Sequence, residues 1–302
     1  MRSNVRERDD AVAWDAASSV RRSRVPGVTM AGFRDLGMDP EGHRMIPHPA
    51  VTLVLDLGAG LPVVEDATGR RHRGSLVAGI GLSGAVWVRG QNIACVQARL
   101  SPVVARAILG VGPAELDGCV VTLDDLWGRQ ASRISEQLGE VSWQDRFALI
   151  ETLLGRRCEA GAPVEPEVAW AWHRMVVGRG RVRVESLAAE LGWSRKRLWS
   201  RFHAQIGLPP KRAAKLVRFD HAAHRLTAGH AAAGVAADGG YADQSHLHRD
   251  VMEFAGVTPA AVAHEPFLAV DDVAWPDQGT PDQPGAAVRR RANGDLRPSG
   301  AP

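Results

Sequence analysis

The residues of this sequence that could most clearly do chemistry form one short basic segment. Arg195, Lys196, Arg197 and Arg201 lie close together, with Trp199 among them. Guanidinium and ammonium groups bind anions through charge and hydrogen bonds, and an indole ring packs against flat or apolar surfaces. The segment therefore indicates binding rather than covalent catalysis, and a polyanion is the ligand that suits it best.

The positive charge of the chain is concentrated around this segment. Residues 174–225 hold thirteen Arg and Lys against three acidic residues, a net charge of +10. The whole chain of 302 residues carries only +3, so the remainder carries about −7. Segregation of this kind favours a polyanionic partner, although a basic surface alone can also be a solvated face.

Two short apolar patterns must position the basic residues. Residues 187–191 fit a short helix that Gly192 ends, and Ser194 can N-cap a second helix. The second helix has an apolar stripe at i, i+4 and i+8: Leu198, Phe202 and Ile206. Its opposite face exposes three residues near the helix start, where recognition helices meet base edges: Lys196, Trp199 and Ser200. This helix-turn-helix pattern favours DNA binding, and the alternative is a solvated amphipathic helix with Trp199 buried.

The same layout returns at residues 234–259. A short helix rich in Ala and Val leads to a corner at Gly240 and Tyr241, and a further helix begins at Asp243 with Leu247 and Val251 at its inner positions. Both copies end in Gly-x-x-Pro. Residues 209–226 between them predict one continuous helix with a buried stripe: Leu216, Phe219, Ala223 and Leu226.

These segments resemble the DNA-binding domain of the AraC-type (AraC/XylS) transcriptional regulators. The resemblance covers about residues 181–263 and rests on "LAAELGWSRKRLWSRFHAQIG", "KLVRFDHAAHRL" and above all "GGYADQSHLHRD....GVTP". It implies a monomeric all-α module over residues 167–265, with two helix-turn-helix units joined by a long helix. Its two recognition helices would lie in successive major grooves of double-stranded DNA and regulate transcription.

The resemblance also assigns roles to individual residues. The base-reading positions fall on Lys196, Trp199 and Ser200 in the first unit, and on Gln244, Ser245, His248 and Arg249 in the second. Gln244 can pair bidentately with adenine and Arg249 with guanine. We expect phosphate contacts from the basic residues of the first unit and of the connecting helix: Arg195, Arg197, Arg201, Lys211, Arg212, Lys215 and Arg218.

The second unit departs from the family pattern. Ala242 replaces the usual hydroxyl cap, so we expect Asp243 to cap the helix, and Asp250 and Glu253 place negative charge beside the phosphate backbone. Residues 226–265 hold one Arg against five acidic residues. We therefore expect the first unit to supply most of the DNA affinity, and the second to modulate it or to contact RNA polymerase.

The first half of the chain is strand-like. Residues 50–58 place Val51, Leu53, Leu55 and Leu57 on one face with period two, and further strands are predicted at residues 84–90 and 93–100. Helical patterns follow at residues 127–140 and 143–160, where Phe147, Ile150, Leu153 and Leu154 form one stripe. The predicted fold class is α+β, with a small β-barrel or sandwich and trailing helices ahead of the all-α domain.

The predicted organisation has a flexible segment at residues 1–25, a sensing or dimerisation domain at 26–160, a linker at 161–166 and a disordered tail at 271–302. The N-terminal domain loosely resembles the β-barrel sensor domains of AraC-type regulators. This implies a small-molecule effector in the barrel mouth, near Trp87 or His48, and a homodimer formed through the helices that follow. The alternative is a domain that only dimerises or packs against its neighbour.

Other motifs carry less weight. Residues 79–84 match Gly-x-Gly-x-x-Gly, but a β-branched segment follows instead of a helix, so a turn between strands is expected. The pairs His221 with His224 and His246 with His248 lack further ligands in sequence, and three widely spaced cysteines have no metal-ligand spacing. We therefore expect no metal, no cofactor and no enzymatic activity.

The composition is that of a globular protein, and the three unpaired cysteines together with the charged N-terminus predict a cytoplasmic location. Hydrophobic residues make up 45% and charged residues 24%, and no apolar run reaches the ~18 residues of a membrane span. The charged N-terminus has no apolar signal segment. Two alternatives stay open: a helix-turn-helix interaction protein with weak or no specific DNA readout, and a small-molecule enzyme in the N-terminal half.

Overall fold

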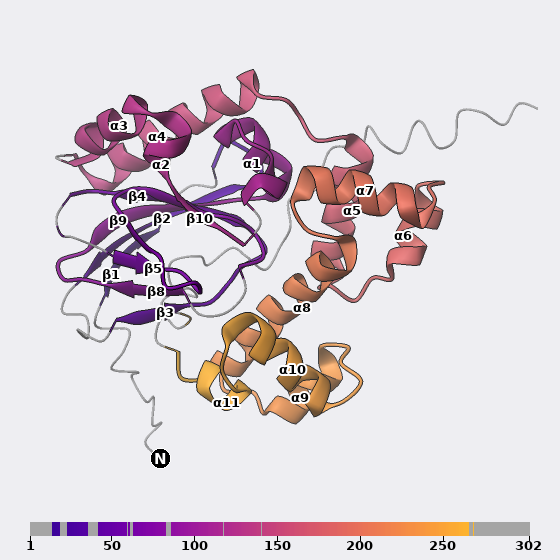
Figure 1. Ribbon diagram of the computed structural model, residues 1–302. Helices are drawn as coiled ribbons and strands as arrows, with labels where there is room; N and C mark the ends of the chain where they lie inside the picture. The colour runs from indigo at the N-terminus through magenta and orange to yellow at the C-terminus, as the bar shows by residue number, and fades with distance from the viewer. Residues whose placement is uncertain are drawn as a thin grey trace, which may run out of the picture.

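The computed structural model describes residues 14–18, 23–35, 42–58, 60, 63–82, 86–116, 118–139, 141–265 and 268. A β-rich part formed by the first half of the chain lies beside a helical part formed by the second half (Figure 1). The predicted disordered tail at residues 271–302, and most of the predicted flexible segment at residues 1–25, lie outside the described residues.

The β-rich part consists of two antiparallel sheets. The larger sheet has the order β1 (Trp14–Ser18), β2 (Val28–Asp35), β9 (Ala94–Leu100), β4 (Val51–Asp56), β7 (Leu76–Ala78) and β10 (Val120–Thr122). The smaller sheet has the order β3 (His43–Met45), β8 (Val86–Arg89), β5 (Val63–Glu65) and β6 (Arg71–Arg73). The predicted combination of a small β-sandwich with an all-α domain is confirmed.

The strand pattern read from the sequence explains the core of the larger sheet. Val51, Leu53 and Leu55 on β4 are fully buried, and the residues between them are only partly buried, as period two requires. Strand β9 lies between β2 and β4 and is buried along its whole length. Strand β1 lies inside the segment that we expected to be flexible, and it pairs with β2. The sequence pattern did not predict this strand.

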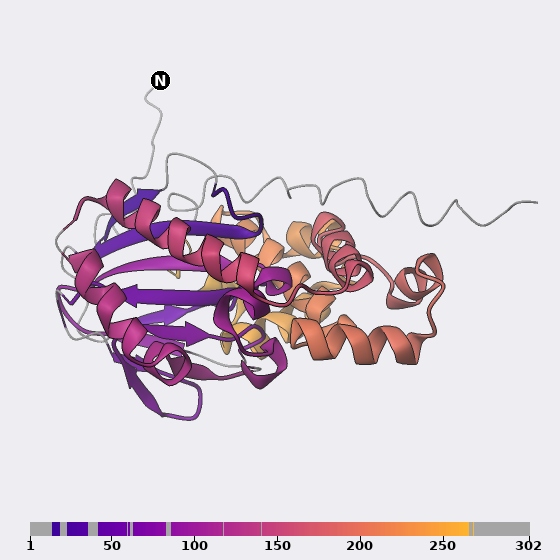
Figure 2. The ribbon, with the colours of Figure 1, turned by 90° about the horizontal axis from the view of Figure 1, so that it is seen from above.

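Helices cover the larger sheet. They are α1 (Pro102–Leu109), the 3-10 helix η2 (Pro113–Leu116), α2 (Leu123–Trp127), α3 (Arg129–Gly139) and α4 (Trp143–Ala160). Figure 2 shows α3 and α4 lying across the strands, and the predicted stripe of α4 buries Phe147, Ile150 and Leu154, with Leu153 partly buried. Gly32 of β2 lets the ring of Trp143 approach the strand, because any side chain there would collide with the indole.

The described residues from 166 to 265 form helices joined by short connections. These helices are α5 (Pro166–Val177), α6 (Val184–Glu190), α7 (Arg195–Ile206), α8 (Pro210–Thr227), α9 (Ala232–Asp238), α10 (Gln244–Ala255) and α11 (Pro259–Val262). Helix α8 has Pro210 in its first turn and buries the predicted stripe Leu216, Phe219, Ala223 and Leu226. The α6/α7 pair and the α9/α10 pair lie at opposite ends of α8 (Figure 1).

Several contacts join the two parts of the molecule. Gly207 has a φ of +92° and packs on Pro113 of η2, so closely that a Cβ atom there would lie 2.7 Å from the Pro113 carbonyl oxygen. The next residue, Leu208, is fully buried against Gly81. At the end of α10, the Ala255 carbonyl accepts a hydrogen bond of 3.1 Å from the Arg44 guanidinium of β3. Among the described helices, none has the length and apolarity needed to cross a membrane.

Candidate nucleic-acid interface

The first helix-turn-helix unit has the local structure that its sequence predicts. Gly192 adopts a positive φ of +64° after α6, and the Ser194 hydroxyl accepts the Arg197 N–H as the N-cap of α7. The stripe Leu198, Phe202 and Ile206 has no exposed surface. The inner face of α7 is thus held in the core, which fixes the direction of its outer face.

The outer face of α7 carries the predicted base-reading residues. Lys196, Trp199 and Ser200 are all exposed, and Trp199 leaves 51% of its surface in solvent. The alternative in which Trp199 is buried under a neighbour is therefore wrong. The Trp199 ring lies 5.0 Å from the ring of His203, one turn further along the helix. An exposed indole on a basic helix can pack on thymine methyl groups or sugar edges.

The second unit repeats this arrangement around α10. The carboxylate of Asp243 accepts the His246 N–H at 2.7 Å, so Asp243 is the N-cap that the sequence predicts. Leu247 and Val251 are fully buried. The predicted base-reading residues of this unit are exposed on the other side: Gln244, Ser245, His248 and Arg249.

Of the two acidic residues of α10 that the sequence placed beside phosphate, Glu253 is exposed and Asp250 is buried. Asp250 is only 1% exposed, and its carboxylate accepts from the Arg218 guanidinium at 2.9 Å and pairs with the Lys215 ammonium at 3.0 Å. Lys215 also pairs with Glu253, and these hydrogen bonds raise its pKa although burial acts to lower it. Since Asp250 follows Leu247 by three residues, it faces α8 with the core stripe. The expectation that Asp250 lies beside phosphate is therefore wrong.

The basic residues assigned to phosphate fall into two groups. Arg195, Arg197 and Lys211 are exposed, and the contact of Arg195 with Glu185, at 3.8 Å, is a loose surface pair. The other four already have partners within the protein. Arg201 pairs with Glu165, Arg212 donates to the Gly81 carbonyl at 3.1 Å, and Lys215 and Arg218 bind Asp250. For these four, contact with phosphate would require an exchange of partners, and their assignment stays a prediction.

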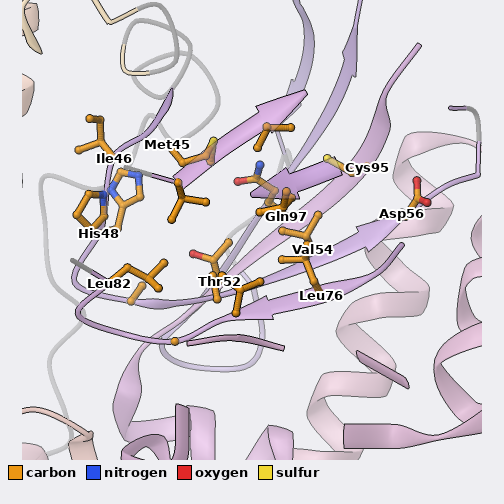
Figure 3. A pocket seen from close by; sticks show the side chains of 18 of the residues that line it. Met45, Ile46, His48, Thr52, Val54, Asp56, Leu76, Leu82, Cys95 and Gln97 are labelled. Atoms are coloured by element: carbon orange, nitrogen blue, oxygen red, sulfur yellow. The ribbon is translucent and has the colours of Figure 1, made fainter. Parts of the chain in front are cut away.

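A second feature of the molecule is a cavity in the β-rich part. Its interior volume is about 90 Å³, and it is lined mainly by aliphatic side chains of both sheets. Figure 3 shows His48 and Ile46 at one end, Asp56 at the other, and Gln97 and Thr52 between them. The sequence analysis placed a ligand near Trp87 or His48. His48 lines the cavity, whereas on β8 it is Val86 and Val88 that do so.

His48 also connects the cavity to the connecting helix α8. Its Nε2 lies 2.7 Å from Arg99 Nη2, and its Nδ1 lies 3.0 Å from the Asp220 carboxylate. Because arginine only donates, Nε2 accepts and Nδ1 carries the proton that is donated to Asp220. Burial acts to raise the pKa of Asp220, but the hydrogen bond from His48 and the surrounding positive charge lower it overall.

The same cluster has the composition of a metal site. Ligand atoms of His48, Asp220 and His224 lie within 4.8 Å of one another. However, the Arg99 guanidinium is bonded to the His48 ring, and a fixed positive charge at that position opposes a second cation. Two sequence features point to this cluster, but no local pattern joins them: His48 is a candidate for ligand contact, and Asp220 is a charged residue adjoining the buried stripe of α8.

The comparison with protein families agrees with the helix-turn-helix geometry. Residues 187–265 match the family model described as "Helix-turn-helix domain". Comparison with curated protein sequences gives no match. Among solved structures, ToxT from Vibrio cholerae is similar at 12% identity over 80% of this chain and 98% of that chain, with a TM-score of 0.45.

Two further structures are similar at the same low level. Wild-type ToxT from Vibrio cholerae with bound unsaturated fatty acid has 10% identity over 81% of this chain and 97% of that chain, with a TM-score of 0.43. The AraC-like transcriptional activator CuxR has 14% identity over 64% of this chain and 81% of that chain, with a TM-score of 0.27. Similarity at this level does not transfer a ligand to this chain.

The C-terminal region is thus a helix-turn-helix DNA-binding domain that follows an antiparallel β domain. The helix-turn-helix fold that the AraC-type resemblance implies is confirmed over residues 187–265.

Proposed function

We propose that this protein recognises a specific double-stranded DNA sequence in the cytoplasm by placing α7 and α10 in successive major grooves. The observation that carries the proposal is the shared design of the two units. Each recognition helix buries its inner stripe completely and leaves its predicted base-reading residues exposed. One continuous helix, α8, separates the two units, and its buried stripe gives the connection stiffness.

We propose further that DNA binding responds to a small molecule in the cavity of the β domain. Support comes from His48, which lines that cavity and also bonds Asp220 of α8. A ligand that displaces the His48 ring would alter the hydrogen bond between this ring and Asp220 of the connecting helix. Such control requires the ligand to bind more tightly when the His48 ring is displaced than when it is bonded to Asp220.

Two partners belong to the same proposal. RNA polymerase would contact the second helix-turn-helix unit, whose α10 leaves Met252 41% exposed beside the DNA-facing residues. A homodimer would form through the helices that follow the strands, where Leu149 of α4 leaves 45% of its surface in solvent. Both surfaces are exposed in the single chain, so neither partner requires the domain to open.

The salt dependence of DNA binding tests the proposal against a helix-turn-helix protein that does not read DNA. If Arg195, Arg197 and Lys211 each neutralise a phosphate, log affinity should fall with log salt with a slope of roughly −3 or steeper. Arg197→Ala should reduce the slope by about 1, whereas Arg73→Ala, an exposed arginine on β6, should leave it unchanged. Fluorescence anisotropy with a labelled duplex at several salt concentrations measures the slope for the protein and for both variants. A slope near zero would rule out phosphate-driven binding and favour the interaction protein.

A further inference from the structure

The cavity of the β domain is lined by very few charged side chains. Its lining comes from both sheets and is aliphatic for most of its length. Among the lining residues that the structure describes, none is a lysine or an arginine, and Asp56 is the single residue with a formal charge. Thr52 and Gln97 add neutral hydrogen-bonding groups between the two ends (Figure 3).

The His48 end offers no cation to a ligand. Both ring nitrogens of His48 are already bonded, one to Arg99 and one to Asp220, so the ring presents carbon atoms to the cavity. Arg99 is 4% exposed and does not line the cavity, and the negative charge of Asp220 lies on the other side of the same imidazole. A carboxylate placed at this end would find neither a free N–H donor on His48 nor direct access to the guanidinium.

The Asp56 end is negative and partly buried. The Asp56 carboxylate accepts the Gly58 N–H at 3.2 Å, and a backbone hydrogen bond from Leu57 also acts on it, so its described hydrogen-bond donors are neutral amides. Burial raises the pKa of Asp56. Burial, together with the charge of Asp56, also raises the pKa of the neighbouring Cys95 thiol to about 12. Both shifts show that a further negative charge is disfavoured at this end.

From this arrangement we infer that the cavity binds an elongated apolar molecule with a neutral or cationic polar group, and that it excludes apolar carboxylates. The apolar walls supply affinity through buried area. A cationic amine would bind at Asp56, where it gains a charge-assisted hydrogen bond to the carboxylate. A carboxylate would lose its hydration and gain no counter-charge. The inference rests on the proposed role of this cavity as the effector site.

Three ten-carbon probes test the selectivity: decylamine, 1-decanol and decanoate, each titrated calorimetrically into the full chain below its critical micelle concentration. We expect the amine and the alcohol to bind, and decanoate to bind at least about tenfold more weakly than either. Asp56→Asn keeps the shape of the side chain and should reduce amine affinity to about that of the alcohol, a loss of about tenfold, with alcohol binding unchanged.

Two more variants locate the binding. Ala78→Leu fills part of the cavity and should weaken the amine and the alcohol alike, whereas Ala160→Leu, at an exposed position on α4, should affect neither. Decanoate binding as tightly as decylamine would overturn the inference, as would no binding of any probe or an amine preference that Asp56→Asn leaves intact. DNA affinity in the same preparation is measured separately, so a failure of the DNA-binding proposal is recognised independently.

Discussion

Replacing Arg195 and Arg197 together by alanine is expected to weaken binding to a specific DNA site by about 2 to 3 kcal/mol, or about 30- to 150-fold. Both side chains are exposed at the start of α7, and the Arg197 guanidinium lies 4.4 Å above the ring of Trp193, which orders it before DNA arrives. Binding at fixed salt should be compared with that of Arg249→Ala, for which we expect a smaller loss of about 1 to 2 kcal/mol.

The comparison tests the expectation that the first unit supplies most of the affinity. Arg249 is exposed on α10, and its Nε makes a long contact of 3.4 Å with the Ser245 carbonyl, so it is free to reach a base. Arg249→Ala should change which sequences are preferred, whereas the double variant should weaken all sequences similarly. Thermal unfolding controls for folding, because all three arginines lie on the surface. A larger loss for Arg249→Ala would show that the first unit is not dominant.

Removal of the Asp250 carboxylate is expected to destabilise the second unit strongly. Asp250→Ala would leave the partly buried Arg218 without its carboxylate partner and Lys215 with Glu253 alone, at a cost of about 3 kcal/mol in the free energy of unfolding. Arg218 also lies 4.5 Å above the ring of Tyr241, which packs at the corner before α10. Loss of the carboxylate should therefore weaken the packing of the recognition helix α10 as well as that of α8.

Urea unfolding gives this free energy, and Asp238→Ala is the matched control. Asp238 pairs with Arg225 at 2.9 Å but is 65% exposed, so its removal should cost less than about 1 kcal/mol. A triple variant in which Asp250, Arg218 and Lys215 are all replaced by apolar residues should recover most of the loss, since no buried charge is left unpaired. An effect of Asp250→Ala no larger than that of the control would show that the buried pairs do not hold α10 in place.

Much of the helical domain could be predicted because each element carries its own local signals. Ser194 and Asp243 as N-caps, Gly192 as a helix end, and stripes spaced by four residues are all short-range patterns, and the structure confirms them. The alternating residues of β4 were equally informative. Such signals act within one or two turns or one strand, so they are visible in the sequence itself.

The contacts between distant segments could not be predicted in the same way. Asp250 appeared to be a DNA-facing acid because its own helix is polar around it, and only the packing of α10 on α8 shows that it binds Lys215 and Arg218. The bond between His48 and Asp220 joins residues 172 positions apart. Strand β1 depends on pairing with β2, and no local sequence pattern predicts that pairing. These features arise from tertiary pairing, which composition and period do not encode.

The central claim is that α7 and α10 read DNA together, and selection of binding sites from a random duplex pool tests it most directly. We predict two enriched sequence blocks on one face of the duplex, with centres about one helical turn, or 10 to 10.5 base pairs, apart. Trp199→Ala should alter only one block and Arg249→Ala only the other. Enrichment of a single block, of two blocks at unrelated spacings, or of no sequence at all would contradict the account.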